Sequence, residues 1–400
     1  MRTFPLLLLC ALPFAAGAQT LTEAEALRLG LARAEVHDLE RGTRALAEAE
    51  VIAAGAWPNP TLDVERERMR TTPRGIDETW KLAQTFELSG RRGLRIEAAE
   101  RRVEAAGAQN AARREELAAE IRRRFHAALH AQQLVKATEA WLGRFLLIES
   151  RIEKQVGAGE ISGYDRRRLA RERQTAAARL ALDQARLLRE RERLGALTGR
   201  PVEALAAPLP PPALPALEQS LARLGQRPEL QRLAHRIEAA ELERRAAARG
   251  GLPDVTLGVG ARRSDDGFKV DRGALVSLSV PLPLFDRQQA GARRAAAEAL
   301  TARAELDLAR LRTEGELRGL HRQTERLTAA AADYRAQAGA AAPELLRIAE
   351  AAWQGGESTL LELLDAYRGA LDTETTALDL EWQARAARID YDLLTGSTPE

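Results

Sequence analysis

The chain has very few soft or aromatic side chains. Its 400 residues include one cysteine, two methionines and 4% aromatic residues. The cysteine, Cys10, lies in an apolar run at the N-terminus, so the rest of the chain can form neither a disulfide nor a thiolate metal site. Acidic and basic residues nearly cancel, with a formal net charge of +2. We therefore expect no general basic surface and no nucleic-acid partner.

Motifs for catalysis are missing as well. No glycine-rich phosphate loop follows a strand, no His-Glu-x-x-His motif is present, and no thiol is available for nucleophilic chemistry. Paired carboxylates are plentiful, but they fall on patterns typical of solvated helix faces. The sequence thus predicts neither an enzyme nor a bound cofactor, with a secreted enzyme on a helical scaffold kept as an alternative.

The N-terminus has the pattern of an export signal. Arg2 precedes an apolar run from Phe4 to Phe14, and the small residues 16–18 follow it, so residues 1–18 are expected to be a signal peptide cleaved after Ala18. Beyond it, no run of 18 apolar residues suggests a transmembrane helix. Tilted strands of about ten residues could still cross a bilayer. Such strands would not appear as an apolar run, because their alternating pattern gives weak hydropathy.

The remaining sequence repeats itself. WPNPTLDV at 57–64 corresponds to LPDVTLGV at 252–259, and GAGEISGYD at 157–165 corresponds to QGGESTLLE at 354–362. This divides the mature chain into repeats over 19–200 and 221–396. The proline-rich segment 201–220 is expected to be an extended connector.

Each repeat predicts two strands and two long helices. Strands are expected at four positions, because apolar and polar residues alternate there. Long proline-free segments with narrow, alanine-rich apolar stripes predict antiparallel coiled-coil helices, which are not typical of one compact core. The expected strands are 60–70, 78–88, 253–263 and 273–284, and the expected helices are 92–156, 160–197, 289–353 and 357–395.

These features resemble the TolC-type outer-membrane efflux proteins. The resemblance rests on the duplicated pattern, on WPNP before the first strand, on SVPLPLFDRQQAGARRAAAE at 279–298 and on GGESTLLELLDAYRGAL at 355–371. AQTFELSGRRGLRIEAAE at 83–100 is similar to the CzcC-like heavy-metal branch. The resemblance to the TolC-type proteins implies a fold that is mainly α with β. Long helices would form a periplasmic α-barrel, and each chain would give four strands to a trimeric twelve-stranded outer-membrane β-barrel.

The resemblance also implies a function and partners. The chain would be a passive duct in the outer membrane with helices in the periplasm, working as a homotrimer in a proton-driven tripartite system for metal resistance. Its partners would be a periplasmic adaptor, an inner-membrane RND-type pump and outer-membrane lipid. Three alternatives stay open: a multidrug duct, a type I secretion duct, and a periplasmic coiled-coil protein similar to an adaptor.

Three groups of site residues follow from this resemblance. Two glycine-containing turns between long helices would be periplasmic tips that contact the adaptor, and a Pro-rich segment would join strand to helix. The residues after the second tip would form a lumen-facing gate, because two acids three residues apart share a helix face and trimer symmetry would make them rings. The tips comprise Gly157, Gly159, Glu160, Ile161, Gly356, Glu357 and Ser358; the transition Pro281, Pro283 and Phe285; and the gate Glu362, Asp365, Tyr367 and Arg368.

Histidine spacing suggests a metal site only weakly. His126 and His130 are four residues apart on one expected helix, a spacing that can bind zinc. His126 also corresponds to His321 in the second repeat, which favours a repeated packing role. We therefore expect no metal ligands here.

Overall fold

The structure is a computed structural model that describes residues 20–69, 75–157 and 162–396. It divides into two compact units. Unit 1 is formed by residues up to Arg33, by 115–219 and by 317 onward, and unit 2 by 34–114 and 220–316. The units do not coincide with the two sequence repeats, because the long helices α3 (Arg91–Gly157) and α7 (Gln289–Tyr334) each contribute to both.

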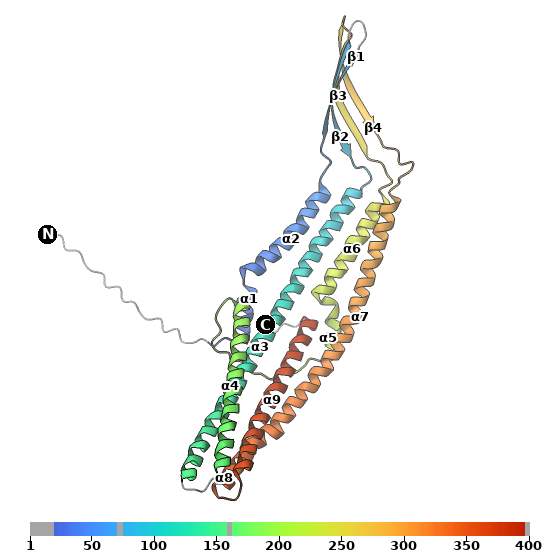
Figure 1. Cartoon of the computed structure of the whole chain (residues 1–400). Helices are drawn as coiled ribbons and strands as arrows, with labels where there is room; N and C mark the ends of the chain where they lie inside the picture. Colours follow the sequence, from blue (N-terminus) through green and yellow to red (C-terminus); the bar gives the residue numbers. More distant parts are fainter. Residues whose placement is uncertain (1–19, 70–74, 158–161, 397–400) are drawn as a thin grey trace, which may run out of the picture. The chain divides into compact units, whose positions relative to one another are not determined.

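Unit 2 contains one antiparallel sheet of four strands in the order β1-β2-β3-β4 (Figure 1). Its strands are β1 (Thr61–Met69), β2 (Gly75–Phe86), β3 (Val255–Asp265) and β4 (Val270–Ser279). Four helical segments accompany the sheet in this unit: α2 (Ala34–Gly55), the first part of α3, α6 (Pro228–Ala248) and the first part of α7.

The fourth strand differs from its expected bounds of 273–284. It begins at Val270 and ends at Ser279. It begins earlier because the turn after β3 is tight: the Asp266 carboxylate accepts bonds from the backbone N–H groups of Phe268 and Lys269. It ends earlier because Pro281 and Pro283 lack the N–H that a sheet ladder requires.

Four of the helical segments of unit 1 pack around an apolar cluster. They are α4 (Gly163–Thr198), α8 (Ala340–Gln354), α9 (Leu360–Thr395) and the second part of α3. One cluster joins all four of them. It contains Phe145, Ile148, Ile152, Leu169, Leu346, Leu360, Leu363, Leu364 and Tyr367.

Another cluster of unit 1 joins α1 (Glu23–Leu31) to the connector. Ile121 and Phe125 of α3 are fully buried there beside Leu205 and Leu209. The segment expected to be an extended connector, 201–220, is non-helical only up to residue 216. The short helix α5 (Leu217–Arg223) then begins, because no proline follows Pro215 to prevent it. A single 3-10 turn, Leu224–Gln226, separates α5 from α6.

The expected helix over 289–353 is interrupted. After α7 the backbone forms a π-turn at Arg335–Gly339, and α8 then contains Pro343. Pro343 cannot donate to the carbonyl of Gly339 four residues earlier, and its ring would clash with that carbonyl in a regular helix. The wider π-turn accommodates this defect. Arg335 of the turn is held by ion pairs to Glu374 and Glu381 of α9, at 2.7 and 2.8 Å.

Within the part of the chain that the structure describes, no helix is both long enough and apolar enough to cross a lipid bilayer.

Candidate functional site

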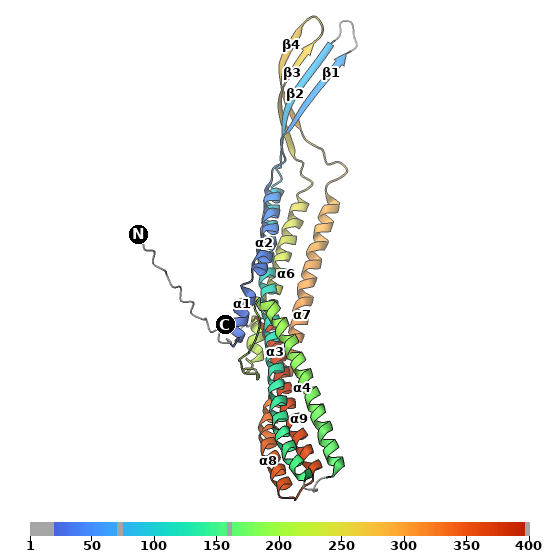
Figure 2. The ribbon, with the colours of Figure 1, turned by 60° about the vertical axis from the view of Figure 1, so that its left-hand side comes forward.

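The second tip lies at the turn between α8 and α9. Gly356 has a left-handed backbone with φ of 73°, which ends α8 and favours glycine. Glu357 is exposed, and Ser358 is half-buried with no hydrogen-bond partner for its hydroxyl among the described residues. The turn lies at the end of unit 1 where α4 begins (Figure 2), and apolar residues of α4 and α9 meet there.

The first tip is described only in part. Gly157 is the last residue of α3, and Ser162 caps the N-terminus of α4 by accepting from the backbone N–H of Asp165. Gly159, Glu160 and Ile161 lie outside the described residues.

Glu362 has a structural partner at the start of α9. Its carboxylate accepts from the backbone N–H of Thr359 at 2.8 Å, while the Thr359 hydroxyl accepts from the backbone N–H of Glu362 at 3.3 Å. This is a capping box, which satisfies two helix-end donors. Hydrogen bonds from Thr359 lower the pKa of Glu362 and keep its carboxylate charged. The sequence contains the signal for this box as Thr359-x-x-Glu362.

Asp365 lies one turn further along α9 and is exposed, as is Glu362. The two carboxylates are therefore both available to solvent in the single chain. Among the ion pairs of the described residues, none joins Glu362 to a basic side chain.

Tyr367, expected to belong to the gate, is buried in the single chain. Its side chain is 2% exposed and its hydroxyl donates to the carboxylate of Glu350 on α8. The Trp141 indole N–H donates to its backbone carbonyl at 2.8 Å. Burial, together with the bond to Glu350, raises the pKa of Tyr367. Tyr367 is buried because it continues the apolar stripe of Leu360 and Leu364 at helical spacing.

Tyr367 also borders two neighbouring cavities of unit 1. They have volumes of about 350 and 380 Å³, and both are also lined by Arg144, Pro343 and Leu346. The cavities adjoin the proline-containing start of α8, where the regular helix is lost. Side chains therefore leave space unfilled beside the irregular part of this helix.

Arg368 pairs with an acid on another helix. Its guanidinium forms two bonds to the carboxylate of Glu172 on α4, with Nε to Oε2 at 3.1 Å. The Glu172 side chain is 7% exposed. Burial would raise the pKa of Glu172, but the hydrogen bonds and charges of Arg368 and Arg171 lower it overall. The pair therefore joins α9 to α4 near the tips.

The sheet has one exposed apolar face. Leu62, Leu82, Val259 and Val276 align in one row across all four strands. Each is at least half exposed, and Val276 reaches 81%. An apolar row of this kind in contact with water is unfavourable, so the face is suited to an apolar environment.

The opposite face is polar and charged. Lys81 pairs with Asp63 at 3.0 Å, and Arg262 pairs with Asp77 at 2.6 Å. Around the Leu82 row, strand alternation therefore places apolar side chains on one face and polar side chains on the other. Nearer the hairpin between β1 and β2, the apolar face also carries a charged pair, Arg66 and Glu78 at 3.2 Å.

The segment after β4 contains the expected transition residues. Pro281, Pro283 and Phe285 lie between Ser279, where β4 ends, and Gln289, where α7 begins. Phe285 is 93% exposed. A large apolar side chain so exposed is available for contact with another apolar surface.

The histidines expected to have packing roles have separate partners. His126 is buried and lies 2.9 Å from the Glu23 carboxylate. His130 stacks on Trp382 and lies 2.8 Å from Asp379. Burial lowers the pKa of both imidazoles, despite the neighbouring acids.

Glu23 belongs to a buried charge network that holds α1. Arg122, at 3% side-chain exposure, contacts Glu23 at 2.6 Å and Asp392 of α9 at 3.0 Å. Burial would raise the pKa of Glu23, but the bonds and charges of His126 and Arg122 hold it at about 2. Three elements distant in sequence, α1, α3 and α9, are therefore tied through one arginine.

Comparison with solved structures defines the class of protein. The crystal structure of CusC, described with transmembrane channel formation, matches with a TM-score of 0.76 and 17% identity over 94% of this chain and 92% of that chain. The fold is that of the TolC-like channels.

Sequence comparison shows which proteins the chain is similar to. Residues 221–397 match the model of the outer membrane efflux protein family. The chain is 28% identical to the cobalt-zinc-cadmium resistance protein CzcC of Cupriavidus metallidurans, over 96% of this chain and 91% of that protein. It is 27% identical to the nickel-cobalt-cadmium resistance protein NccC of Alcaligenes xylosoxydans xylosoxydans, over 71% of this chain and 66% of that protein. The chain is thus similar to outer membrane efflux proteins over its second repeat, and to metal-resistance proteins over most of its length.

Proposed function

We propose that the chain is the outer-membrane duct of a tripartite system that exports divalent heavy-metal cations. The observation that carries this is similarity along nearly the whole chain to a protein named for cobalt, zinc and cadmium resistance. The duct is passive: a pump in the inner membrane, of the proton-driven RND type, supplies the energy, and a periplasmic adaptor joins pump to duct.

Sheet edges support assembly into a trimer. β1 and β4 form the two edges of the four-stranded sheet. Exposed edges offer backbone N–H and C=O groups to another chain. When β4 of one copy pairs with β1 of the next, three copies make a closed sheet of twelve strands, which has no edge. The row containing Leu62 and Val276 then faces lipid, and the charged face with Lys81 and Arg262 faces the pore.

Both tips would contact the adaptor. The second tip presents Gly356, Glu357 and Ser358, of which Glu357 is exposed. The first would present Gly157, Gly159, Glu160 and Ile161. Chain reversal at the end of unit 1 leaves backbone and short side chains accessible, which suits the docking of a helical partner.

Glu362 and Asp365 would provide the gate charges. In a trimer they form two rings of three carboxylates, which concentrate cations at a pore mouth. Glu362 serves the capping box with one carboxylate oxygen and still carries its negative charge. Arg368, paired with Glu172, would hold α9 against α4 in the closed tip, and the buried Tyr367 would position α9 rather than line the pore.

The experiment is deletion of the gene in its native host, followed by measurement of cell-associated cobalt, zinc and cadmium after exposure to each. Deletion is expected to raise retained metal, and the intact gene on a plasmid should restore export. Unchanged metal content together with new sensitivity to organic toxicants would overturn the metal assignment and favour a multidrug duct.

A further inference from the structure

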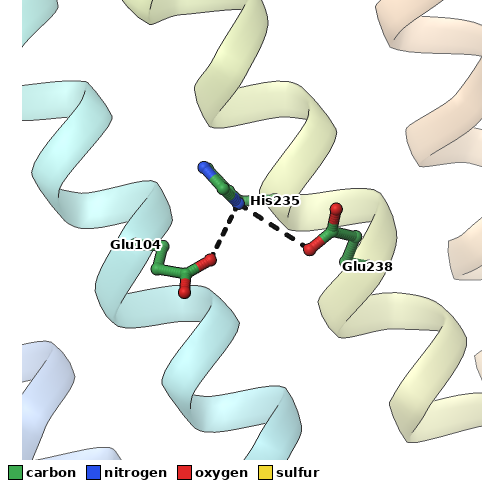
Figure 3. A group of neighbouring side chains, drawn as sticks. All are labelled: Glu104, His235 and Glu238. Carbon is green, nitrogen blue, oxygen red and sulfur yellow. Dashed lines mark ion pairs between the residues drawn. The ribbon is translucent and has the colours of Figure 1, made fainter.

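A histidine and two glutamates converge between two helices of unit 2. Glu104 lies on α3, and His235 and Glu238 lie on α6. Figure 3 shows Nδ1 of His235 directed between the two carboxylates, with the other ring nitrogen pointing away. Nδ1 lies 3.0 Å from Oε2 of Glu104 and 3.8 Å from Oε2 of Glu238.

The imidazole nitrogen lacks a proper hydrogen bond. Nδ1 of His235 is buried, and among the described residues no partner meets it with hydrogen-bond geometry. A lone pair on Nδ1 that faces two carboxylate oxygens is repelled by both. A cation between the three atoms, either a proton or a metal ion, removes that repulsion.

The separations suit a metal ion. With bonds of about 2.0–2.2 Å, two ligands of one tetrahedral zinc ion lie roughly 3.4 Å apart. The distances of 3.0 and 3.8 Å lie on either side of that value, and all three ligand atoms are within 4.8 Å of one another. Small side-chain rotations would therefore complete three ligands, with water as the fourth.

Arg101 pairs with the same two carboxylates. Its guanidinium lies 2.7 Å from Oε2 of Glu104 and 3.4 Å from Oε2 of Glu238. Its side chain is 43% exposed, so it can swing into solvent. Exposed pairs of this kind contribute only about 0–1 kcal/mol. A divalent cation can therefore displace Arg101 at small cost.

We propose that Glu104, His235 and Glu238 bind a divalent transition-metal cation of the zinc type, and that Arg101 competes with it. Imidazole with carboxylates selects zinc, cobalt, nickel or copper over calcium and magnesium, which prefer oxygen ligands. The ion joins α3, from the first sequence repeat, to α6, from the second. This site does not depend on the proposed transport function, since it is assigned from the side chains alone.

The test is calorimetric titration of zinc ions into the full-length protein, purified in detergent and freed of metal by a chelator. His235→Gln is expected to weaken zinc binding by at least about tenfold. Arg101→Gln should strengthen it by up to about fivefold, because the competing cation is gone. Calcium should not bind at this site.

The matched control is His37→Gln. His37 lies in the same unit and, like His235, has a glutamate three residues later: its Nδ1 is 3.7 Å from Oε2 of Glu40. Unlike His235, it pairs with one carboxylate and not with two. This variant should bind zinc as the wild type does. Equal affinity of wild type and His235→Gln, or an equal loss in His37→Gln, would overturn the proposal and leave an ion-pair cluster only. If His235→Gln does not fold, Glu238→Gln at the exposed end of the cluster replaces it in the comparison.

Discussion

Arg368 of α9 and Glu172 of α4 form a two-point ion pair, in which the acid is almost fully buried and the arginine is partly exposed. The planar guanidinium matches both carboxylate oxygens. No feature of the local sequence around either residue indicates the other, since 196 positions separate them. This contact links the two helices that begin at the tips, α4 and α9.

Arg368→Ala should loosen the tips. The variant leaves Glu172 buried with only Arg171 as a partner, which should lower the free energy of unfolding by about 1–3 kcal/mol. In planar bilayers we expect a higher open fraction than for the wild type. The matched control is Arg347→Ala, which breaks an exposed pair with Glu344 on α8 and should change neither quantity appreciably. Equal effects of both variants would show that the Arg368 pair has no special role.

Two variants, Thr359→Ala and Glu362→Gln, distinguish the effect of the helix cap from the effect of the Glu362 charge. Thr359→Ala removes the hydroxyl that caps α9 and should cost about 1 kcal/mol in unfolding experiments. Glu362→Gln keeps an acceptor for the Thr359 N–H, so it should cost less while removing one charge per chain. A larger loss of stability for Glu362→Gln than for Thr359→Ala would contradict the capping assignment.

Acid should weaken the attachment of α1. The pKa of Glu23 is about 2 in the folded chain and 4.5 in the unfolded chain, so its stabilising contribution is present above pH 4.5 and is lost as pH falls toward 2. The contribution is about 3 kcal/mol by linkage. Burial also lowers the pKa of His126, which adds a loss in the same direction as pH falls. In urea unfolding across this pH range, the free energy of unfolding should depend less steeply on pH in Glu23→Gln than in the wild type. An unchanged pH dependence would refute the assignment.

Arg385→Met should release the proline-rich connector. Arg385 of α9 is buried and donates to the carbonyls of Pro208 and Leu209, at 2.9 and 3.0 Å, and to that of Pro210. The prolines supply acceptors but no donors, so the arginine satisfies carbonyls that the connector cannot satisfy itself. We expect faster proteolysis within 201–216 at unchanged helix content. Arg385→Lys should restore protection only in part, because an ammonium lacks the planar fork. Cleavage at the wild-type rate in Arg385→Met would contradict this role.

Local patterns were sufficient to predict much of the fold. The proline-free stretch predicted α3 nearly to the residue, and strand alternation predicted the sheet's apolar row. The repeat pattern does not predict the π-turn before Pro343, because the first repeat has no proline at the corresponding position. The resemblance places Tyr367 in the gate group, and its spacing from Leu360 and Leu364 accounts for its burial.

Contacts between distant segments could not be predicted in the same way. Arg122 joins α1 to α9, and Arg385 holds the connector, through partners 99 to 270 residues away. Such pairings depend on how helices align side by side, which hydrophobic periodicity does not fix. The same holds for the approach of Glu104 to His235 across α3 and α6.

Ion conductance of the purified protein in a planar lipid bilayer tests the central claim most directly. A duct of the proposed kind should give discrete conductance steps, and a salt gradient should give a reversal potential that favours cations. The double substitution Glu362→Gln with Asp365→Asn should move that potential toward zero. A protein that inserts no conducting pores would contradict the duct. A reversal potential that the double substitution leaves unchanged would contradict the carboxylate gate.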